Sequence, residues 1–350
     1  MRVAIEATSL TVSSGGLARY TSELSLALAR EFPDDEFVLI SDQVFQLPEG
    51  APVNLKRGGG PRTAGERRWW LWGIAREMGR LGADVVHGPD FAVPYIPRRP
   101  SVMTLHDLSP WLDERWHHAA HRVKHRTPVL LDLGLATMIV TPSETVRKQA
   151  IERFRLRPNR VVAVPEAAPS WMKPAHPAPR APYFLFVGTL EPRKNLPAMV
   201  DAWRAVRRDH AIDLVLAGRA RADGPQFPPE PGLHILGEVP DADLPRLYSG
   251  AVAFLYPSLY EGFGLPVVEA MQCGACVIAS RAVEELAGDA AVYFDTSDEL
   301  AAAMRAAVQS PEWVSDWRAR SLERAAQFSW DRTARQTYEV YREARRRFGQ

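Results

Sequence analysis

The sequence predicts an α/β protein with two doubly wound, Rossmann-like parallel-sheet domains that face a cleft. Short apolar runs alternate with longer amphipathic stretches, which is typical of parallel strands joined by crossover helices. A proline-rich stretch interrupts this alternation near the middle, and 350 residues suffice for roughly two hydrophobic cores. We therefore expect domains over residues 1–170 and 183–329, a linker over 171–182 and a C-terminal helix over 330–350.

The first half begins with an apolar run and a helical pattern. Residues 17–31 carry apolar side chains at the spacing of a helix, among them Leu17, Tyr20 and Leu24. Several apolar runs have no polar interruption, as expected for strands covered on both faces. The strands expected here are residues 3–6, 37–40, 84–87, 102–105, 138–140 and 161–164.

The second half begins after a segment rich in proline. Six prolines fall within the eighteen residues 165–182, which excludes a central strand or helix and predicts a semi-rigid linker. Two helical patterns, 311–327 and 330–348, end the chain. The strands expected between linker and tail are residues 183–187, 214–217, 234–236, 252–256, 277–279 and 292–294.

Composition excludes several classes of protein. An apolar share of 46% and a charged share of 24% are ordinary for a globular chain and exclude a disordered or collagenous one. With 43 basic and 42 acidic residues the net charge is +1, so no global field attracts nucleic acid. No signal peptide and no apolar stretch of about 18 residues is visible, so we expect a cytoplasmic protein.

The most informative segment follows the expected strand 252–256. Gly262 and Gly264 allow close approach of the backbone to a ligand, and Pro266 suits the first position of a helix. The free N–H groups of that helix predict an anion site. Glu261 and Glu269 lie before and within this helix, so the pattern fits a ligand with phosphate in its middle and hydroxyl groups at both ends.

A second segment has the same order of strand, glycine turn and helix. The expected strand 183–187 runs into Gly188, and a helix is expected to begin near Asn195. Arg193 and Lys194 lie between them, at the carboxyl end of the strand. Two adjacent cations there are suited to a diphosphate.

Together these segments resemble the retaining glycosyltransferases of family 4, also called glycosyl transferases group 1, which have the GT-B fold. The Glu-x7-Glu hallmark of that family is matched by Glu261 and Glu269, and its Gly-Thr-Leu-Glu-Pro-Arg-Lys-Asn turn by residues 188–195. Further matches are Ser13-Ser-Gly-Gly-Leu-Ala-Arg-Tyr, Thr104-Leu-His-Asp-Leu and Phe328-Ser-Trp-Asp-Arg-Thr. This form of the turn is similar to that of mannosyl- and rhamnosyl-transferring relatives of polysaccharide biosynthesis, and the chain resembles the mannosyltransferase-like subgroup.

The resemblance implies roles for individual residues. Arg193 and Lys194 would bind the diphosphate of a nucleotide sugar. Glu269 would accept hydrogen bonds from the ribose hydroxyls, and Glu261 would contact the donor sugar. His106 would lie beside that sugar. The tail helix would pack on the N-terminal domain, which would bind the acceptor. The remaining donor-binding positions would be Gly15, Gly16, Gly188, Val239, Phe263, Gly264 and Leu265.

The resemblance also implies the chemistry. A hexose would move from a nucleotide-diphosphate sugar, with GDP-mannose as the favoured donor, to a hydroxyl of a glycan, a lipid-linked saccharide or a small molecule. No cofactor and no divalent metal are expected. Front-side attack is the expected route to retention, and a Glu261 nucleophile is the alternative. Residues 281–285 form a shorter loop than the family pattern, with Glu284 where proline is usual, which weakens the inference on the donor.

Other readings of the sequence remain open. A non-catalytic or epimerase-type GT-B protein that binds sugar nucleotides is the alternative to a transferase. Residues 56–80 hold seven basic and two acidic residues around Trp69-Trp70-Leu71-Trp72, which fits either contact with an anionic membrane surface or an acceptor-side helix.

Three short motifs resemble metal or redox sites. Asp241 and Asp243 form a D-x-D that we attribute to helix capping, and Cys273 and Cys276 form a C-x-x-C at a helix end. A histidine stripe lacks an acidic or cysteine partner, so we expect no metal site there either. The stripe consists of His117, His118, His121 and His125.

Overall fold

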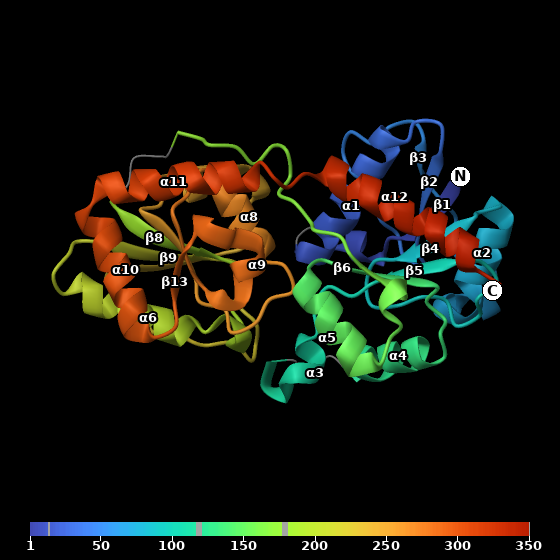
Figure 1. Cartoon of the computed structure of the whole chain (residues 1–350), viewed down its shortest axis with the longest axis horizontal. Coiled ribbons are helices and arrows are strands. Elements are labelled where there is room, and N and C mark those ends of the chain that lie inside the picture. The colour runs from blue at the N-terminus through green and yellow to red at the C-terminus, as the bar shows by residue number, and fades with distance from the viewer. Residues whose placement is uncertain (13–14, 117–120, 177–180, 350) are drawn as a thin grey trace. The chain divides into compact units, whose positions relative to one another are not determined.

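The structure is a computed structural model that describes residues 1–12, 15–116, 121–176 and 181–349. The chain forms two compact units (Figure 1). The first comprises Met1–Glu166 with Trp330–Gln350, and the second comprises Ala167–Ser329. Each unit holds one sheet in which all neighbouring strands are parallel.

The sheet of the first unit has the strand order β3-β2-β1-β4-β5-β6-β7. The strand order reverses between β1 and β4, so the sheet is doubly wound. In such sheets ligands bind at the carboxyl ends of the strands beside this reversal. Most of these strands are buried on both faces, and their core-forming residues are almost all aliphatic. The strands are β1 (Arg2–Glu6), β2 (Glu36–Ile40), β3 (Leu55–Arg57), β4 (Val85–Gly88), β5 (Ser101–Thr104), β6 (Met138–Thr141) and β7 (Val161–Ala163).

The C-terminal helix α12 belongs to the first unit, where it lies beside α1 (Figure 1). The rings of Phe32 and Tyr338 stack with centroids 3.6 Å apart. Deeper in the unit, the hydroxyl of Tyr341 lies 2.7 Å from Nδ1 of the buried His87 on β4. The helices of this unit are α1 (Gly16–Glu31), α2 (Ile74–Leu81), α3 (Ser109–Leu112), α4 (His121–Asp132), α5 (Glu144–Phe154) and α12 (Trp330–Arg347).

The sheet of the second unit has the order β10-β9-β8-β11-β12-β13. All five residues of β8 are buried, because helices cover both faces of this central strand. The order reverses between β8 and β11. The strands are β8 (Tyr183–Val187), β9 (Asp213–Ala217), β10 (Leu233–Gly237), β11 (Ala253–Tyr256), β12 (Val277–Ser280) and β13 (Val292–Phe294).

In the part of the second unit that the structure describes, six α-helices pack around the sheet. Trp203 of α6 is the largest fully buried side chain, and its indole N–H donates to the carbonyl of Ile212 at 3.1 Å. The helices are α6 (Leu196–Arg207), α7 (Leu244–Gly250), α8 (Leu265–Gln272), α9 (Glu284–Ala287), α10 (Ser297–Gln309) and α11 (Pro311–Ala325).

The predicted α/β class and the twelve predicted strands are confirmed, with ends that differ by at most one residue. Strand β3 was not predicted. It is a three-residue edge strand in which only Leu55 is buried, so it leaves no apolar run in the sequence. Helix α8 begins at Leu265, and Pro266 is therefore its second residue rather than its first.

The proline-rich stretch differs from the linker that we expected. Its described residues belong to the second unit from Ala167 onward. The side-chain amide of Gln272 donates to the carbonyls of Pro169 and Met172, both at 2.7 Å. The side chain of Met172 is fully buried. Proline prevented a helix or strand here, but hydrogen bonds from α8 hold the extended chain against the unit.

Candidate active site

The strongest candidate residues lie where the order of the second sheet reverses. Strands β8 and β11 are hydrogen-bonded neighbours, so the loops after them leave the same sheet edge side by side. Arg193 and Lys194 follow β8, and Glu261 follows β11. Ligands of open α/β sheets bind at this position.

The turn after β8 is built by its own sequence. Residues Pro192–Lys194 form a 3₁₀-helix, for which the fixed φ of proline is suited as first residue. Asn195 then adopts a left-handed conformation, with φ 51°, and α6 begins at Leu196, close to the start that the sequence predicted near Asn195. Asparagine tolerates this conformation better than most side chains. The turn leaves both cations buried at the sheet edge.

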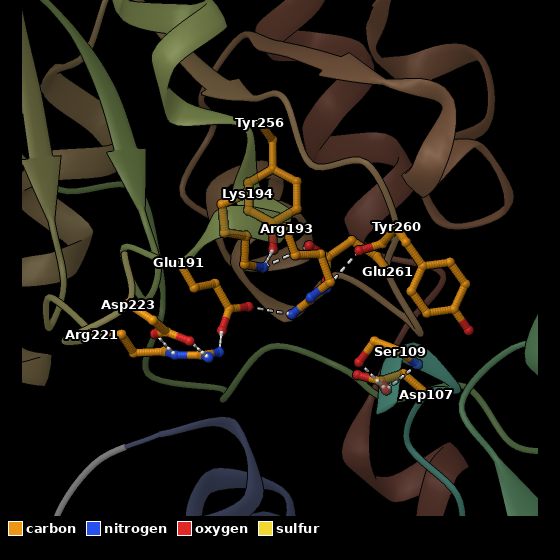
Figure 2. Close-up of polar contacts among 10 residues, drawn as sticks. All are labelled: Asp107, Ser109, Glu191, Arg193, Lys194, Arg221, Asp223, Tyr256, Tyr260 and Glu261. Carbon is orange, nitrogen blue, oxygen red and sulfur yellow. Dashed lines mark hydrogen bonds and ion pairs between the residues drawn. The ribbon is translucent and has the colours of Figure 1, made fainter. Parts of the chain in front are cut away.

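A buried ion-pair cluster joins the two loops (Figure 2). Lys194 Nζ donates to Glu261 Oε1 at 2.6 Å and to the hydroxyl of Tyr256 at 2.7 Å. Arg193 Nη1 lies 3.0 Å from Glu261 Oε2. One carboxylate therefore receives a separate cation on each of its oxygens.

These contacts determine the charges in the cluster. Burial raises the pKa of Glu261, but Arg193 and Lys194 outweigh this effect and lower it to about 2. Burial lowers the pKa of Lys194, and the attraction of Glu261 opposes that change. Burial and the Glu261 charge raise the pKa of Tyr256 well above its usual value, so its phenol stays protonated.

Arg193 also fixes the backbone of the neighbouring loop. Its Nη1 donates to the carbonyl of Tyr260 at 2.5 Å, and its own carbonyl accepts from the N–H of Leu259 at 2.9 Å. Its Nη2 donates to Glu191 Oε1 at 2.8 Å. The residue that precedes Glu261 is thus held by the same guanidinium that pairs with Glu261.

The start of α8 requires glycine. Gly264 has φ 101°, and a Cβ atom there would lie 2.9 Å from Cγ1 of Val283. The N–H groups that follow Phe263 open the helix and carry its positive dipole end, as the sequence predicted. Glu269, further along α8, is buried and accepts a hydrogen bond from the hydroxyl of Tyr248 at 3.1 Å.

Two further donor-site candidates lie along the same sheet edge. Gly188 directly follows β8, and its N–H donates to the carbonyl of Ala217 at 2.9 Å. Val239 follows β10 and packs, half-buried, against the core of the second unit. Both therefore lie at carboxyl ends of strands, which the sequence predicted for Gly188.

In the first unit, His106 lies two residues beyond β5. Its Nε2 is 2.6 Å from the carbonyl of Pro89, which only accepts, so Nε2 carries a hydrogen. Its Nδ1 lies 3.2 Å from Glu166 Oε1. Burial lowers the pKa of His106, but the hydrogen bond and charge of Glu166 outweigh it and raise the pKa. Glu166 thus favours the imidazolium form.

Of the glycines in the first unit, the two predicted to bind the donor lie at the start of α1. Gly15 precedes the helix with φ 116°, and Gly16 is its first residue. Such a φ favours glycine. Ser13 and Ser14, the first residues of this motif, lie outside the described residues.

The short motifs that resemble metal or redox sites have ordinary surroundings. Cys273 and Cys276 are buried free thiols, and burial raises the pKa of both to about 12, which disfavours the reactive thiolate. Asp243 precedes α7, and its side chain makes no capping hydrogen bond to that helix.

The histidine stripe is described only in part. His121 and His125 lie exposed on α4, while His117 and His118 fall outside the described residues. Within the described ranges, no three histidine, cysteine, aspartate or glutamate side chains gather as metal ligands would. Metal independence stays a prediction.

The tryptophan-rich segment does not form one amphipathic α-helix. Residues Trp69–Gly73 form a π-helix in which Trp69 is buried and Trp72 is 39% exposed. Across the residues that the structure describes, no helix combines the length and apolar character needed to span a bilayer.

Sequence reasoning missed three polar residues of these sites. Glu191 and Tyr256 contact the predicted cations, and Glu166 contacts His106. Glu191 stands two residues before Arg193 within the family motif, which was a usable signal. Glu166 lies 60 residues from His106 in the chain, and only the pairing of β5, β6 and β7 brings the two strand ends to one edge.

Comparisons with known proteins agree with this architecture. Residues 14–168 match the family described as glycosyltransferase family 4, and residues 181–310 match glycosyl transferases group 1. The O-antigen chain mannosyltransferase B of Escherichia coli is 34% identical over 283 residues, which cover 74% of each chain.

Solved structures share the fold at low sequence identity. Sucrose-phosphate synthase from Thermosynechococcus elongatus has a TM-score of 0.74 at 17% identity and covers 98% of both chains. Anabaena HepE, solved with UDP and glucose, has a TM-score of 0.70 at 16% identity and covers 97% of this chain and 98% of its own. The fold is thus GT-B, and the chain belongs to the family 4 glycosyltransferases and is a hexosyltransferase.

Proposed function

We propose that this enzyme transfers a hexose, with retention of configuration and without a divalent metal, from a nucleoside-diphosphate sugar to a hydroxyl of a glycan, a lipid-linked saccharide or a small molecule. The observation that carries the proposal is the pairing of Arg193 and Lys194 with Glu261 at the reversal point of the second sheet. GDP-mannose is the favoured donor, because the Escherichia coli relative is named a mannosyltransferase.

The proposed task of Arg193 and Lys194 is to stabilise the diphosphate as it leaves. Glycosyl transfer passes through an oxocarbenium-like state, and negative charge develops on the leaving group. Two buried cations near the N-terminus of α8 are suited to that charge. Metal independence follows the family resemblance, with these two side chains as the groups that would contact the diphosphate.

The charge state of Glu261 supports front-side attack over a covalent intermediate. A carboxylate with a pKa of about 2, paired with two cations, is a weak base and a weak nucleophile. We therefore assign Glu261 to hydroxyls of the donor sugar. The departing phosphate would take the proton of the acceptor hydroxyl.

The other donor contacts follow the family resemblance. Glu269 would accept ribose hydroxyls in exchange for its bond to Tyr248, Val239 would lie by the base, and His106 would lie by the donor sugar. An imidazolium at His106 would stabilise negative charge that develops near it during the transfer. The backbone of Gly15, Gly16, Gly188, Phe263, Gly264 and Leu265 would complete the donor site.

We further propose peripheral contact between the first unit and an anionic membrane. Arg67 and Arg68 are exposed, and Trp72 and Tyr95 expose 39% and 37% of their surface. Basic and aromatic side chains together are typical of membrane-surface segments. Flotation with phosphatidylglycerol vesicles tests this contact. Binding that is lost in Trp72→Ala supports it, and no binding at low salt contradicts it.

A thermal-shift panel of nucleotide sugars tests the donor proposal. A donor that binds only the native state raises the melting temperature by mass action. We expect a shift with GDP-mannose, retained in EDTA, and a smaller one with other donors. No shift with any nucleotide sugar would contradict the proposal. A shift without sugar transfer or with epimerisation would favour the non-catalytic or epimerase-type alternative.

A further inference from the structure

Glu191 bridges two arginines in the candidate active site (Figure 2). Its Oε1 accepts from Arg193 Nη2 at 2.8 Å, and its Oε2 accepts from Arg221 Nη1 at 2.6 Å. The residue is only 7% exposed. A buried carboxylate in which each oxygen receives a different guanidinium is held in one orientation.

The bridge extends the charged cluster across three adjacent strands. Arg221 follows β9, Glu191 follows β8, and Glu261 follows β11, in the order in which these strands lie in the sheet. Asp223 binds Arg221 at its far end, with Nε 2.8 Å and Nη2 2.5 Å from the two carboxylate oxygens. Positive and negative groups thus alternate along the sheet edge, from Asp223 to Lys194.

Arg193 stands in the middle of this series. Glu191 binds its Nη2 and Glu261 binds its Nη1, so the two carboxylates contact different nitrogens of one planar guanidinium. Removal of Glu191 takes a carboxylate from Nη2, whereas Nη1 keeps both Glu261 and the carbonyl of Tyr260. The direction of Nη2, and with it the plane of Arg193, therefore depends on Glu191.

We propose that Glu191, held in place by Arg221, is a positioning residue that orients the Arg193 guanidinium toward the leaving diphosphate. This inference rests on the proposed donor chemistry. The series holds three cations and three carboxylates, so its charges balance. Loss of the Glu191 charge makes the edge more positive. It misorients Arg193 without weakening the attraction for an anion.

The variant Glu191→Gln tests this role because an amide keeps the size of the side chain but accepts through one oxygen only. With GDP-mannose and UDP-glucose as probes, kcat is expected to fall at least tenfold for the donor that the wild type uses. The Kd for the matching nucleoside diphosphate is expected to stay within threefold or become tighter. Glu191→Asp is expected to recover part of the kcat.

Arg221→Gln is expected to lower kcat as well, and the double variant is expected to be no worse than Glu191→Gln alone, since both act through Arg193. The matched control is Glu230→Gln, which breaks an ion pair with Arg204 at 3.1 Å at the opposite edge of the sheet. It is expected to keep the wild-type kcat. The inference would be overturned if the folded Glu191→Gln protein kept the wild-type kcat. It would also be overturned if this variant lost kcat and nucleotide affinity to the same extent.

A readout without donor separates this inference from the proposed function. In the wild type, nuclear magnetic resonance of the labelled guanidinium groups is expected to show restricted rotation for Arg193, which Glu191→Gln relieves. If the rotation of the Arg193 guanidinium stayed equally restricted in Glu191→Gln, the inference would be overturned. A wild type that turns over no nucleotide sugar would contradict the proposed function, while relief of the restriction would still support the hold of Glu191 on Arg193.

Discussion

Lys194 Nζ lies 2.6 Å from Glu261 Oε1, although 67 residues separate the two in the chain. The contact exists because β8 and β11 are neighbours and both chains turn at the same sheet edge. It joins Lys194, which we propose to bind the diphosphate, to the first glutamate of the Glu-x7-Glu motif. The two family motifs thus form one electrostatic unit in this structure.

Replacement of Lys194 is expected to weaken nucleotide binding. Lys194→Met keeps much of the side-chain volume but removes one of the two cations, and a lost charge-assisted contact costs about 2–3 kcal/mol, or roughly a 30- to 150-fold loss in affinity. Calorimetric titration with GDP measures it. Lys173→Met, at an exposed lysine of the same unit, is the control. Equal Kd values for Lys194→Met and the wild type would contradict the diphosphate assignment.

Glu261 makes stability depend on pH in the acid range. The pKa of Glu261 is about 2 in the folded chain against an ordinary 4.5. As the pH falls, this carboxylate is therefore protonated at a higher pH in the unfolded chain than in the folded chain. Its contribution, on the order of 3 kcal/mol, is therefore complete above pH ~4.5 and is lost as the pH falls toward ~2.

Urea unfolding of the wild type and Glu261→Gln at pH 7 and pH 3.5 measures this effect. The glutamine variant leaves Arg193 and Lys194 without their shared carboxylate, so it is expected to be less stable at pH 7. The difference between the two proteins is expected to narrow at pH 3.5. A difference of the same size at both pH values would refute the low pKa.

The sheet edge could be predicted from the sequence, but its ion pairs could not. Uninterrupted apolar runs identify central strands such as β8, and glycines mark the turns after them. The strand order, which makes β8 and β11 neighbours, is a long-range property that no local pattern contains. Hence Arg193, Lys194 and Glu261 were placed at strand ends, while their mutual neutralisation and the bridge through Glu191 appear only in the structure.

The packing of α12 shows the same limit. Its helical pattern could be predicted from the sequence. Its partner His87 lies 254 residues away in the chain and has no sequence signal beyond a polar residue in an apolar strand. Tertiary contacts alone reveal this hydrogen bond.

Loss of that hydrogen bond is expected to destabilise the first unit. Burial lowers the pKa of His87 to about 3, so its imidazole is neutral and Nδ1 relies on the hydroxyl of Tyr341. Tyr341→Phe leaves a buried polar nitrogen without that partner, at a cost of about 1–3 kcal/mol. Urea unfolding measures it against Tyr95→Phe, at a 37% exposed tyrosine, for which no change is expected. A Tyr341→Phe protein as stable as the wild type would contradict this account.

A side chain at Gly264 is expected to disturb both stability and donor binding. Gly264→Ala imposes a φ of 101° on alanine and brings its Cβ to 2.9 Å from Val283, which costs about 1–3 kcal/mol in backbone strain and shifts the start of α8. Thermal unfolding and the Kd for GDP measure the two effects. Gly79→Ala, inside α2 with open space around it, is the control and is expected to be neutral or stabilising. An unaltered Kd in Gly264→Ala would show that the helix start does not contact the nucleotide.

The central claim is that the cations after β8 act on the diphosphate of a donor sugar. Transfer of radiolabelled mannose from GDP-mannose to a mannoside acceptor, in EDTA, tests it most directly when wild type, Lys194→Met and Lys173→Met are compared. The account predicts transfer with an α-linked product by the wild type and Lys173→Met, and less than about one hundredth of that rate for Lys194→Met, a loss of roughly 2.7 kcal/mol or more in transition-state stabilisation. Equal rates for all three proteins, or no turnover of this or any other nucleotide sugar by the wild type, would contradict it.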